Sequence, residues 1–264
     1  MRRRVIAFDL DGTLAVSKSA ISDTMADLVG QLLNIYDVCV ISGGKFEQFE
    51  LQVIRHLDVD PRLLSKLHIM PTSGTSYLRY DEAKKEWKTQ YSEDLDPDTR
   101  AHVKEVLIDG AKELGLWNPN PYGEIVEDRG SQITFSALGQ AAPVDQKHRW
   151  DPDGAKKESL RAYAAQRLPH LEVRTGGTTS IDVTALGIDK AYGMHKLMTA
   201  LGLTMRDILF FGDKLDEGGN DHPVKAMGID SIAVRSPDET AVALEAILKT
   251  SERIKERGND ESTS

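Results

Sequence analysis

The stretch VIAFDLDGTL, residues 5–14, decides the fold of this chain. Its first four residues are continuously apolar, which predicts a short strand covered on both faces of a parallel sheet. Asp9 and Asp11 follow at once, and Gly12 lets the chain turn sharply. Open α/β sheets bind their ligands beyond the carboxyl ends of their strands. We therefore expect an α/β protein with functional carboxylates at the end of this strand.

The segments that follow repeat the pattern of a parallel sheet. Apolar residues at helical spacing predict a helix over 25–33, and the apolar run 38–41 predicts the next strand. Near the C-terminal end, runs at 208–211 and 232–234 predict two more strands, and a helix-capping sequence, SPDE, begins at Ser236. Strand, helix, strand with short connections is the repeating unit of a parallel sheet. Both ends of the chain are thus expected to contribute to one sheet.

The middle of the chain, residues 82–188, has a different pattern. The residues predict strands near 124–127, 131–137, 171–175 and 180–184 and helices near 100–114 and 155–168. Antiparallel strands packed on helices, inserted between two halves of a parallel sheet, indicate a separate α+β domain. We expect a core domain of residues 1–81 and 189–264, with residues 82–188 as the inserted domain.

Composition narrows the possible partners and the compartment. The chain has 264 residues, a formal net charge of −9 and a pI of about 5.3, so a nucleic-acid backbone or an anionic membrane would repel it on average. The single cysteine, Cys39, lies in an apolar run and fits a buried residue in a reducing compartment. We find neither a signal peptide nor an apolar run of the roughly 18–20 residues that a membrane span needs. The expectation is a cytoplasmic protein without nucleic-acid or membrane partners.

Asp9 and Asp11 have the spacing of a nucleophile and an acid/base. A carboxylate directly after a buried strand can attack phosphorus and form an aspartyl phosphate. A second carboxylate two residues later can give a proton to the leaving oxygen and take one from the incoming nucleophile. An isolated pair of aspartates is more often a turn or a surface feature. The complete DLDGT sequence after an apolar strand favours catalysis.

Two further groups could stabilise the transferring phosphoryl group. The Ser42 hydroxyl and the amides of Gly43 and Gly44 can point at phosphoryl oxygens, although an ordinary glycine turn is the alternative. The ammonium of Lys190, in GIDKAYG, can offset the repulsion between the nucleophile and the phosphoryl group. A lone lysine usually faces solvent. Only the position of Lys190 in the chain, after the DLDGT and Ser42 motifs and before the GGND motif, favours a catalytic role.

The run FFGDKLDEGGND, residues 210–221, predicts a metal site. Asp213 follows a buried strand and, with Asp9 and the backbone carbonyl of Asp11, can supply the hard oxygen ligands that Mg²⁺ prefers. Asn220 and Asp221 can fix the outer shell of the metal and Lys190. A calcium-binding EF-hand is the competing interpretation, but the glutamate expected at its twelfth position and a preceding helix are both missing.

In this order, DLDGT, Ser42, Lys190 and GDK with GGND, the chain resembles the haloacid dehalogenase-like phosphotransferases, and within them the eukaryotic-type phosphomannomutases. The stretches that carry the resemblance are DLDGTLAVSKSAIS, ISGGKFEQFE, GGTTSIDVTALGIDKAYG and FFGDKLDEGGNDH. The resemblance implies a parallel, Rossmann-like core with residues 82–188 as a substrate-binding α+β cap. It also implies Mg²⁺, an aspartyl-phosphate intermediate, hexose phosphate substrates and often a dimer joined through the caps.

Carried over residue by residue, the resemblance implies substrate contacts in the cap. Arg129 matches a substrate-binding arginine, and Ser180 and Asp182 match contacts to sugar or phosphate. For Asp182, a solvent-facing carboxylate at a strand end is the alternative. Elsewhere the chain departs from the family: Lys18, Gln140 and either Lys147 or Arg149 stand where the family places arginines. A lysine cannot reproduce the two-pronged contact of an arginine with phosphate, and glutamine carries no charge.

Three functions remain open from the sequence. The first is interconversion of mannose 6-phosphate and mannose 1-phosphate, with a hexose 1,6-bisphosphate as activator. The second is a sugar-phosphate phosphatase, which needs only one phosphate contact. Ser42 is more similar to the corresponding serine of the general phosphatases of the superfamily. The third is a non-catalytic sensor of phosphosugars, which the presence of both Asp9 and Asp11 disfavours.

Overall fold

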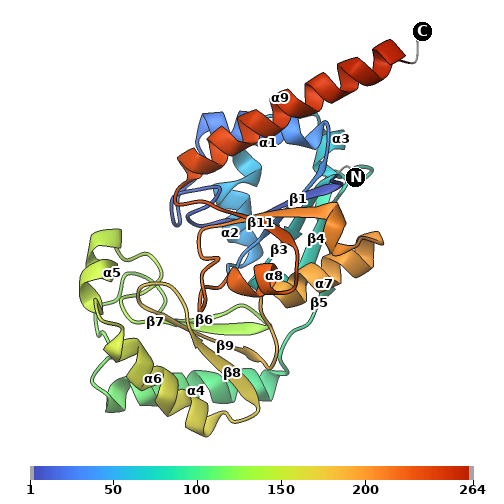
Figure 1. The fold of residues 1–264 in the computed structure, drawn as a ribbon. Coiled ribbons are helices and arrows are strands. Elements are labelled where there is room, and N and C mark those ends of the chain that lie inside the picture. Colours follow the sequence, from blue (N-terminus) through green and yellow to red (C-terminus); the bar gives the residue numbers. More distant parts are fainter. Residues whose placement is uncertain (1–2, 262–264) are drawn as a thin grey trace. The chain divides into compact units, whose positions relative to one another are not determined.

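The computed structural model describes residues 3–261, the last ten of them as backbone only. The chain forms two compact units, residues 1–91 with 189–264 and residues 92–188 (Figure 1). We call the first the core unit and the second the inserted unit. The connections between them are the two chain crossings at 91–92 and 188–189.

A mixed sheet forms the centre of the core unit. Its seven strands run in the order β11-β10-β1-β2-β3-β4-β5, parallel from β11 to β3 and antiparallel between β3 and β4. The strands are β1 (Val5–Asp9), β2 (Asp37–Ile41), β3 (Leu67–Met70), β4 (Ser76–Asp81), β5 (Glu86–Ser92), β10 (Ile208–Gly212) and β11 (Asp230–Ala233). The helices are α1 (Asp23–Leu33), α2 (Phe46–Gln52), α3 (Pro61–Leu64), α7 (Lys190–Leu201), α8 (His222–Ala226) and α9 (Pro237–Glu261), with 3-10 turns at Ile54–His56, Thr72–Gly74 and Met205–Asp207. The predicted α/β class with a central parallel sheet is confirmed.

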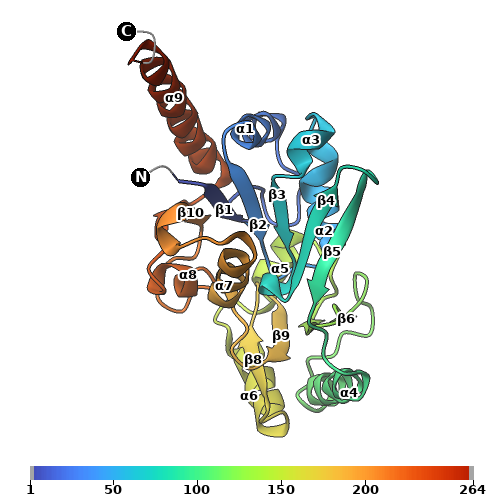
Figure 2. The same cartoon turned by 90° about the vertical axis from the view of Figure 1, so that its right-hand side faces the viewer.

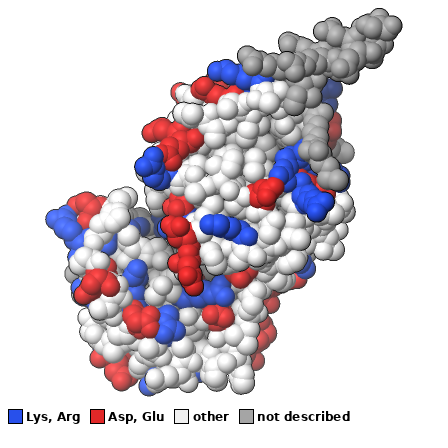
Figure 3. All heavy atoms as spheres, in the orientation of Figure 1, with Lys and Arg blue, Asp and Glu red and all other residues white. Residues whose placement is uncertain are grey.

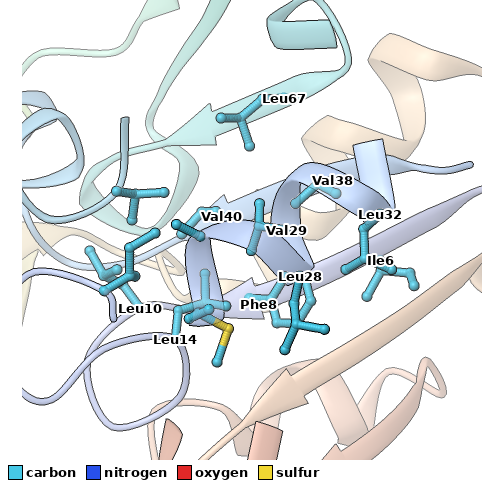
Figure 4. Packing of buried hydrophobic residues seen from close by; sticks show 14 of the residues in the cluster. Ile6, Phe8, Leu10, Leu14, Leu28, Val29, Leu32, Val38, Val40 and Leu67 are labelled. Carbon is cyan, nitrogen blue, oxygen red and sulfur yellow. The ribbon is translucent and has the colours of Figure 1, made fainter. Parts of the chain in front are cut away.

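The side chains of β1 alternate between two hydrophobic clusters. Ile6 and Phe8 pack with apolar residues of α1, such as Leu28 and Leu32 (Figure 4), and with α9. Phe8 also stacks on Phe211, with ring centroids 5.2 Å apart. Val5 and Ala7 face the opposite cluster, to which α7 and α8 contribute. Figures 1 and 2 show these two pairs of helices on opposite faces of the sheet. A fully buried Phe or Ile contributes about 1.5–3 kcal/mol, so burial on both faces fixes the strand register.

This register brings the predicted strand ends together. Phe8 is opposite Phe211 in β10, and Asp9 is opposite Ile41 in β2. The chain segments that begin at Asp9, Ser42 and Gly212 therefore leave the sheet from neighbouring strands at the same edge.

The boundary of the core unit differs from the expected residue 82. It falls after Tyr91, because β4 and β5 extend the core sheet. Strand β5 has mostly exposed polar residues, and only Trp87 and Tyr91 are half-buried, against Tyr80 and Tyr77 respectively. An edge strand with so little apolar surface lacks the continuous apolar run that identified the other core strands.

The inserted unit is a four-stranded antiparallel sheet packed on two helices. The sheet order is β6-β7-β9-β8. The elements are α4 (Pro97–Glu113), β6 (Val126–Asp128), β7 (Gln132–Ser136), α5 (Val144–Trp150), α6 (Ala155–Arg167), β8 (Leu171–Thr175) and β9 (Ser180–Ala185). Apolar residues such as Ile133 and Val183 pack with α4 and α6. The alternate residues Glu127, Thr134 and Asp182 lie in register on the opposite face. This unit therefore has one apolar and one polar sheet face.

Helix hydropathy, surface charge and the single cysteine bear on the predicted partners and compartment. Within residues 3–261, no helix combines the length and apolar character that a membrane crossing requires. Acidic and basic side chains lie interspersed on the face drawn in Figure 3. Cys39 is buried, and burial raises the pKa of its thiol.

Candidate active site

A buried lysine joins two of the predicted aspartates. Lys190 Nζ lies 2.5 Å from Asp9 Oδ1 and 2.6 Å from Asp221 Oδ1. All three side chains are at most 5% exposed, and Asp9 and Lys190 are 181 positions apart in the sequence. The sequence predicted roles for each residue, and the structure brings them together as one charged cluster.

The cluster has unusual protonation equilibria. Burial raises the pKa of Asp9 to about 7, and the negative charges of Asp221 and Asp213 act in the same direction, whereas Lys190 opposes them. Burial alone would lower the pKa of Lys190, but the two adjacent carboxylates hold that pKa above its usual value. Lys190 therefore stays charged, whereas Asp9 is partly protonated at neutral pH.

Close backbone packing fixes the position of Lys190. Asp189 caps α7 by accepting a hydrogen bond from the Tyr192 amide, and Lys190 is the first residue of the helix. A Cβ at Gly193 would lie 2.7 Å from the Ser73 carbonyl oxygen, and one at Gly74 would lie 2.3 Å from the Gly193 Cα. Only glycine permits this approach, which anchors the N-terminal turn of α7 beside the turn that follows β3.

Asp213 completes a group of carboxylates that could hold a metal ion. Ligand atoms of Asp9, Asp213 and Asp221 all lie within 4.8 Å of one another. Gly12 has φ of +87°, and a Cβ there would lie 2.6 Å from Asp213 Oδ2, so glycine is needed for the loop after β1 to approach Asp213. Asp213 Oδ1 is buried and has no hydrogen-bond partner among the described residues. Burial also raises the pKa of Asp213. A buried, unpartnered oxygen among clustered carboxylates fits a site for a hard divalent cation.

Asp221 differs from the other two aspartates because hydrogen bonds already engage both of its oxygens. Oδ1 accepts from Lys190, and Oδ2 accepts from the Lys214 amide at 3.0 Å. A Cβ at Gly212 would lie 2.6 Å from Asp221, which explains glycine at the end of β10. Asn220 is exposed in the same loop. This geometry suits Asp221 to holding Lys190, the role that the sequence suggested for it.

The Ser42–Gly44 segment follows β2, and the turn after β3 forms hydrogen bonds with its backbone. The buried Ser42 hydroxyl accepts a long hydrogen bond, 3.4 Å, from the Gly44 amide. The amides of Ser73 and Thr72 donate to the carbonyls of Ser42 and Gly44, at 2.9 and 3.0 Å. Thr72 and Ser73 both have positive φ, at 48° and 56°, which is a strained conformation for these residue types. The strained turn thus fixes the backbone of the predicted phosphate-binding segment.

Asp11 does not join the carboxylate cluster through its side chain. Its Oδ1 accepts from the Lys18 amide at 2.7 Å and from Gln52 Nε2 at 3.2 Å, and its Oδ2 accepts from Gln48 Nε2 at 3.0 Å. The two glutamines were missed by the sequence analysis. Their spacing of four residues on α2, directly after the Ser42–Gly44 segment, is the signal that could have identified them.

The predicted substrate residues of the inserted unit hold partners within that unit. Arg129 donates to Glu127 from Nε at 2.8 Å and from Nη2 at 2.6 Å. Asp182 Oδ1 accepts from Gln132 Nε2 at 2.9 Å and from the Thr134 hydroxyl at 2.7 Å. Register on the polar face places Glu127, Thr134 and Asp182 on adjacent strands. Ser180, half-buried, begins β9 two residues before Asp182.

The remaining predicted cations are more exposed. Lys147 is half-buried on α5, and its Nζ donates to the Gln140 carbonyl at 3.0 Å. Arg149 forms an ion pair with Asp145 one helical turn away, and its side chain is 74% exposed. Lys18, in the core unit, is an exposed residue with φ of 56° whose amide is bound by Asp11.

Comparison with solved structures defines the fold class. A haloacid dehalogenase-like hydrolase from Bacteroides thetaiotaomicron matches with a TM-score of 0.64 at 18% identity, covering 93% of this chain and 100% of that one. The IMP-nucleotidase of Plasmodium falciparum matches with a TM-score of 0.69 at 14% identity, covering 94% of this chain and 68% of that one. The chain thus has the haloacid dehalogenase-like fold.

Sequence comparison defines the family. The family model described as eukaryotic phosphomannomutase matches residues 26–250. A probable phosphomannomutase of Caenorhabditis elegans is 24% identical over 94% of this chain and 96% of its own length. A phosphomannomutase of Arabidopsis thaliana is 23% identical over 92% and 96%. This chain belongs to the eukaryotic phosphomannomutase family, and the resemblance drawn from its motifs is confirmed. It is therefore an enzyme.

Proposed function

We propose that this enzyme interconverts mannose 6-phosphate and mannose 1-phosphate by transferring the phosphoryl group to and from Asp9. The observation that carries the proposal is the buried contact of Asp9 with Lys190, which is itself held by Asp221. A fixed ammonium beside the attacking carboxylate reduces its repulsion from an anionic phosphoryl group without reorganisation during the reaction. The family membership of the chain supports the same activity.

The reaction proceeds in two transfers. A carboxylate oxygen of Asp9 forms a bond to phosphorus while the bond from phosphorus to the sugar oxygen breaks, and Asp11 gives that oxygen a proton. In the reverse transfer, Asp11 takes a proton from the other sugar hydroxyl as it attacks the aspartyl phosphate. In the catalytic cycle, Asp9 is first phosphorylated by a hexose 1,6-bisphosphate as activator and gives this phosphoryl group to the free hydroxyl of the hexose monophosphate. The bisphosphate so formed returns its other phosphoryl group to Asp9 and leaves as the isomeric monophosphate.

The carboxylate cluster would hold Mg²⁺ through Asp9, Asp213 and the backbone carbonyl of Asp11, with Asn220 and Asp221 in the outer shell. The buried, unpartnered Asp213 Oδ1 supports this site. When bound, Mg²⁺ supplies positive charge against the phosphoryl oxygens and favours the ionised form of Asp9. The Ser42 hydroxyl and the amides of Gly43 and Gly44 contact the same oxygens.

The inserted unit is proposed as the substrate-binding cap. Asp182 would accept hydrogen bonds from sugar hydroxyls, with Ser180 beside it, and Arg129 would bind the phosphate that is not being transferred. Lys147 or Arg149 adds charge in the cap and Lys18 adds charge in the core unit. We further propose a cytoplasmic homodimer joined through this unit, with sugar phosphates as ligands rather than nucleic acid or membrane.

A phosphatase acting on the same substrates is the second candidate. Lys18 and Gln140 favour it, because a point charge and a neutral residue hold a second phosphate less firmly than arginines do. A non-catalytic sensor is disfavoured by the intact pair of Asp9 and Asp11. The test supplies mannose 1-phosphate with and without a hexose 1,6-bisphosphate and follows both the isomer and free phosphate. Isomer formation that depends on the bisphosphate is expected. Release of phosphate without isomer under both conditions would exclude the mutase.

A further inference from the structure

Helix α2 holds the side chain of Asp11 through two glutamines. Gln48 and Gln52 lie one helical turn apart, and each donates its Nε2–H to the Asp11 carboxylate, at 3.0 and 3.2 Å. Gln52 is 4% exposed, and its Nε2 also donates to the Ser19 carbonyl at 2.7 Å. The second contact fixes the amide plane of Gln52, so its contact with Asp11 has a defined direction.

The loop before α2 leaves room for this arrangement. A Cβ at Gly44 would lie 2.1 Å from Gln48 Oε1, so a larger residue there would displace the glutamine from Asp11. Gly44 therefore has a packing role in addition to offering its amide to a phosphate. The loop that follows β2 and the helix that follows this loop act together on one carboxylate.

The contacts leave the two oxygens of Asp11 in different states. Oδ1 accepts two hydrogen bonds, from Gln52 and from the Lys18 amide, whereas Oδ2 accepts one, from Gln48. An ionised carboxylate has about four acceptor positions, two on each oxygen. Counting the contacts made by described residues, the position left open is on Oδ2.

We propose that Gln48 and Gln52 are positioning residues that fix Asp11 so that it exchanges its proton through Oδ2. This inference rests on the proposed acid/base role of Asp11. The proton on Oδ2 moves to the sugar oxygen as the bond from that oxygen to phosphorus breaks. In the reverse transfer, the proton of the attacking hydroxyl returns to Oδ2. Both glutamine contacts persist throughout, because the proton occupies the position that they leave open.

The experiment compares leaving groups in Gln48→Met and Gln52→Met, which keep the length of the side chain and remove the donor. With mannose 1-phosphate, whose leaving oxygen needs a proton, we expect single-turnover phosphoryl transfer to slow about tenfold, with KM within twofold. With p-nitrophenyl phosphate, whose leaving group needs no proton, the first transfer should change less than twofold. A merely structural role would slow both substrates equally.

Asp11→Ala and Gln31→Met are the reference variants. Asp11→Ala should show the same dependence on the leaving group, with a larger loss of transfer rate from mannose 1-phosphate. Gln31→Met, at an exposed site on α1, should transfer from both substrates at the rate of the parent enzyme. If Asp11→Ala shows no such dependence, the proposed role of Asp11 is wrong. If Asp11→Ala shows it but Gln48→Met slows both substrates equally or neither, the positioning role is wrong. Gln48 is half-buried, so Gln48→Met decides the question if Gln52→Met fails to fold.

Discussion

The charged groups of the core unit and those of the inserted unit are held in different ways. In the core unit, Lys190 is 2% exposed and contacts two carboxylates, and a third lies nearby. In the inserted unit, Asp182 accepts hydrogen bonds from the neutral side chains of Gln132 and Thr134. Arg149 there is paired on an open helix surface. The core site thus has a cluster of buried charges, whereas the groups of the inserted unit range from the largely buried pair of Arg129 with Glu127 to the exposed pair on α5.

This difference follows from what each region is proposed to do. Phosphoryl transfer needs charges that do not reorganise, and burial makes their interactions strong. Recognition of a phosphosugar in two orientations needs hydrogen bonds that can be exchanged for others at small cost. Substitutions in the core unit should therefore abolish turnover or strongly reduce stability. Substitutions in the inserted unit should change KM by smaller, graded amounts.

The largest effect is expected for Asp9→Asn. The amide cannot form an acyl phosphate, so turnover should fall by about 10³-fold or more and no phosphoenzyme should form. The substitution also removes a carboxylate whose charge is disfavoured by burial, so the fold should be retained. Activity assays, phosphoenzyme trapping and thermal unfolding test this together. An active variant would show that another residue is the nucleophile.

Lys190→Met should affect both activity and stability. Removing the ammonium leaves Asp9 and Asp221 buried without their cation, and breaking such an arrangement costs about 3–5 kcal/mol. Denaturant unfolding measures the change in free energy, and Lys225→Met, an exposed lysine on α8, is the matched control. A loss no larger than that of the control would mean that the ion pairs of Lys190 contribute little.

The pH dependence of stability should reveal the carboxylate cluster. Because the pKa of Asp9 is about 7 in the folded chain and 3.8 for the unperturbed group, the corresponding stability is present below about pH 4 and is lost as the pH rises through 7. Without divalent cations, unfolding between pH 5.5 and 8 should become easier by on the order of a few kcal/mol. Added Mg²⁺ should raise Tm more at pH 8 than at pH 5.5. Asp9→Asn should remove most of the pH dependence; its persistence would contradict the assignment to Asp9.

Asp182→Asn should have a graded effect. The variant keeps an oxygen for Gln132 and Thr134 but loses the negative charge, so the fold should be unchanged. We expect KM for a hexose phosphate to rise about tenfold, with a smaller change in kcat. Asp109→Asn, at an exposed position on α4, is the control. An unchanged KM would remove Asp182 from the proposed sugar contacts.

The smallest effects are expected on α5. Lys147 is half-buried and Arg149 is largely exposed, so Lys147→Ala should raise KM several-fold, about fivefold, and Arg149→Ala less than twofold. Steady-state kinetics with mannose 1-phosphate compare the two variants directly. The opposite order would identify Arg149 as the phosphate contact.

The fold and the central carboxylates were predictable because their signals are local. Four apolar residues followed by Asp9, and another apolar strand followed by Gly212 and Asp213, define strand ends without reference to the rest of the chain. The edge strand β5 was missed, since its residues have little apolar surface and it pairs only because β4 precedes it. The boundary expected at residue 82 was too early for the same reason.

The sequence by itself determined which residue types stand at the strand ends, because apolar runs and turn residues act over a few positions. Only the tertiary structure decided which of them meet. Lys190 reaches Asp9 because two parallel strands lie side by side and two glycines let α7 approach. Asp11, two residues from Asp9, turns instead to the glutamines of α2. Side-chain direction depends on packing between elements distant in the chain, which no short stretch of sequence contains.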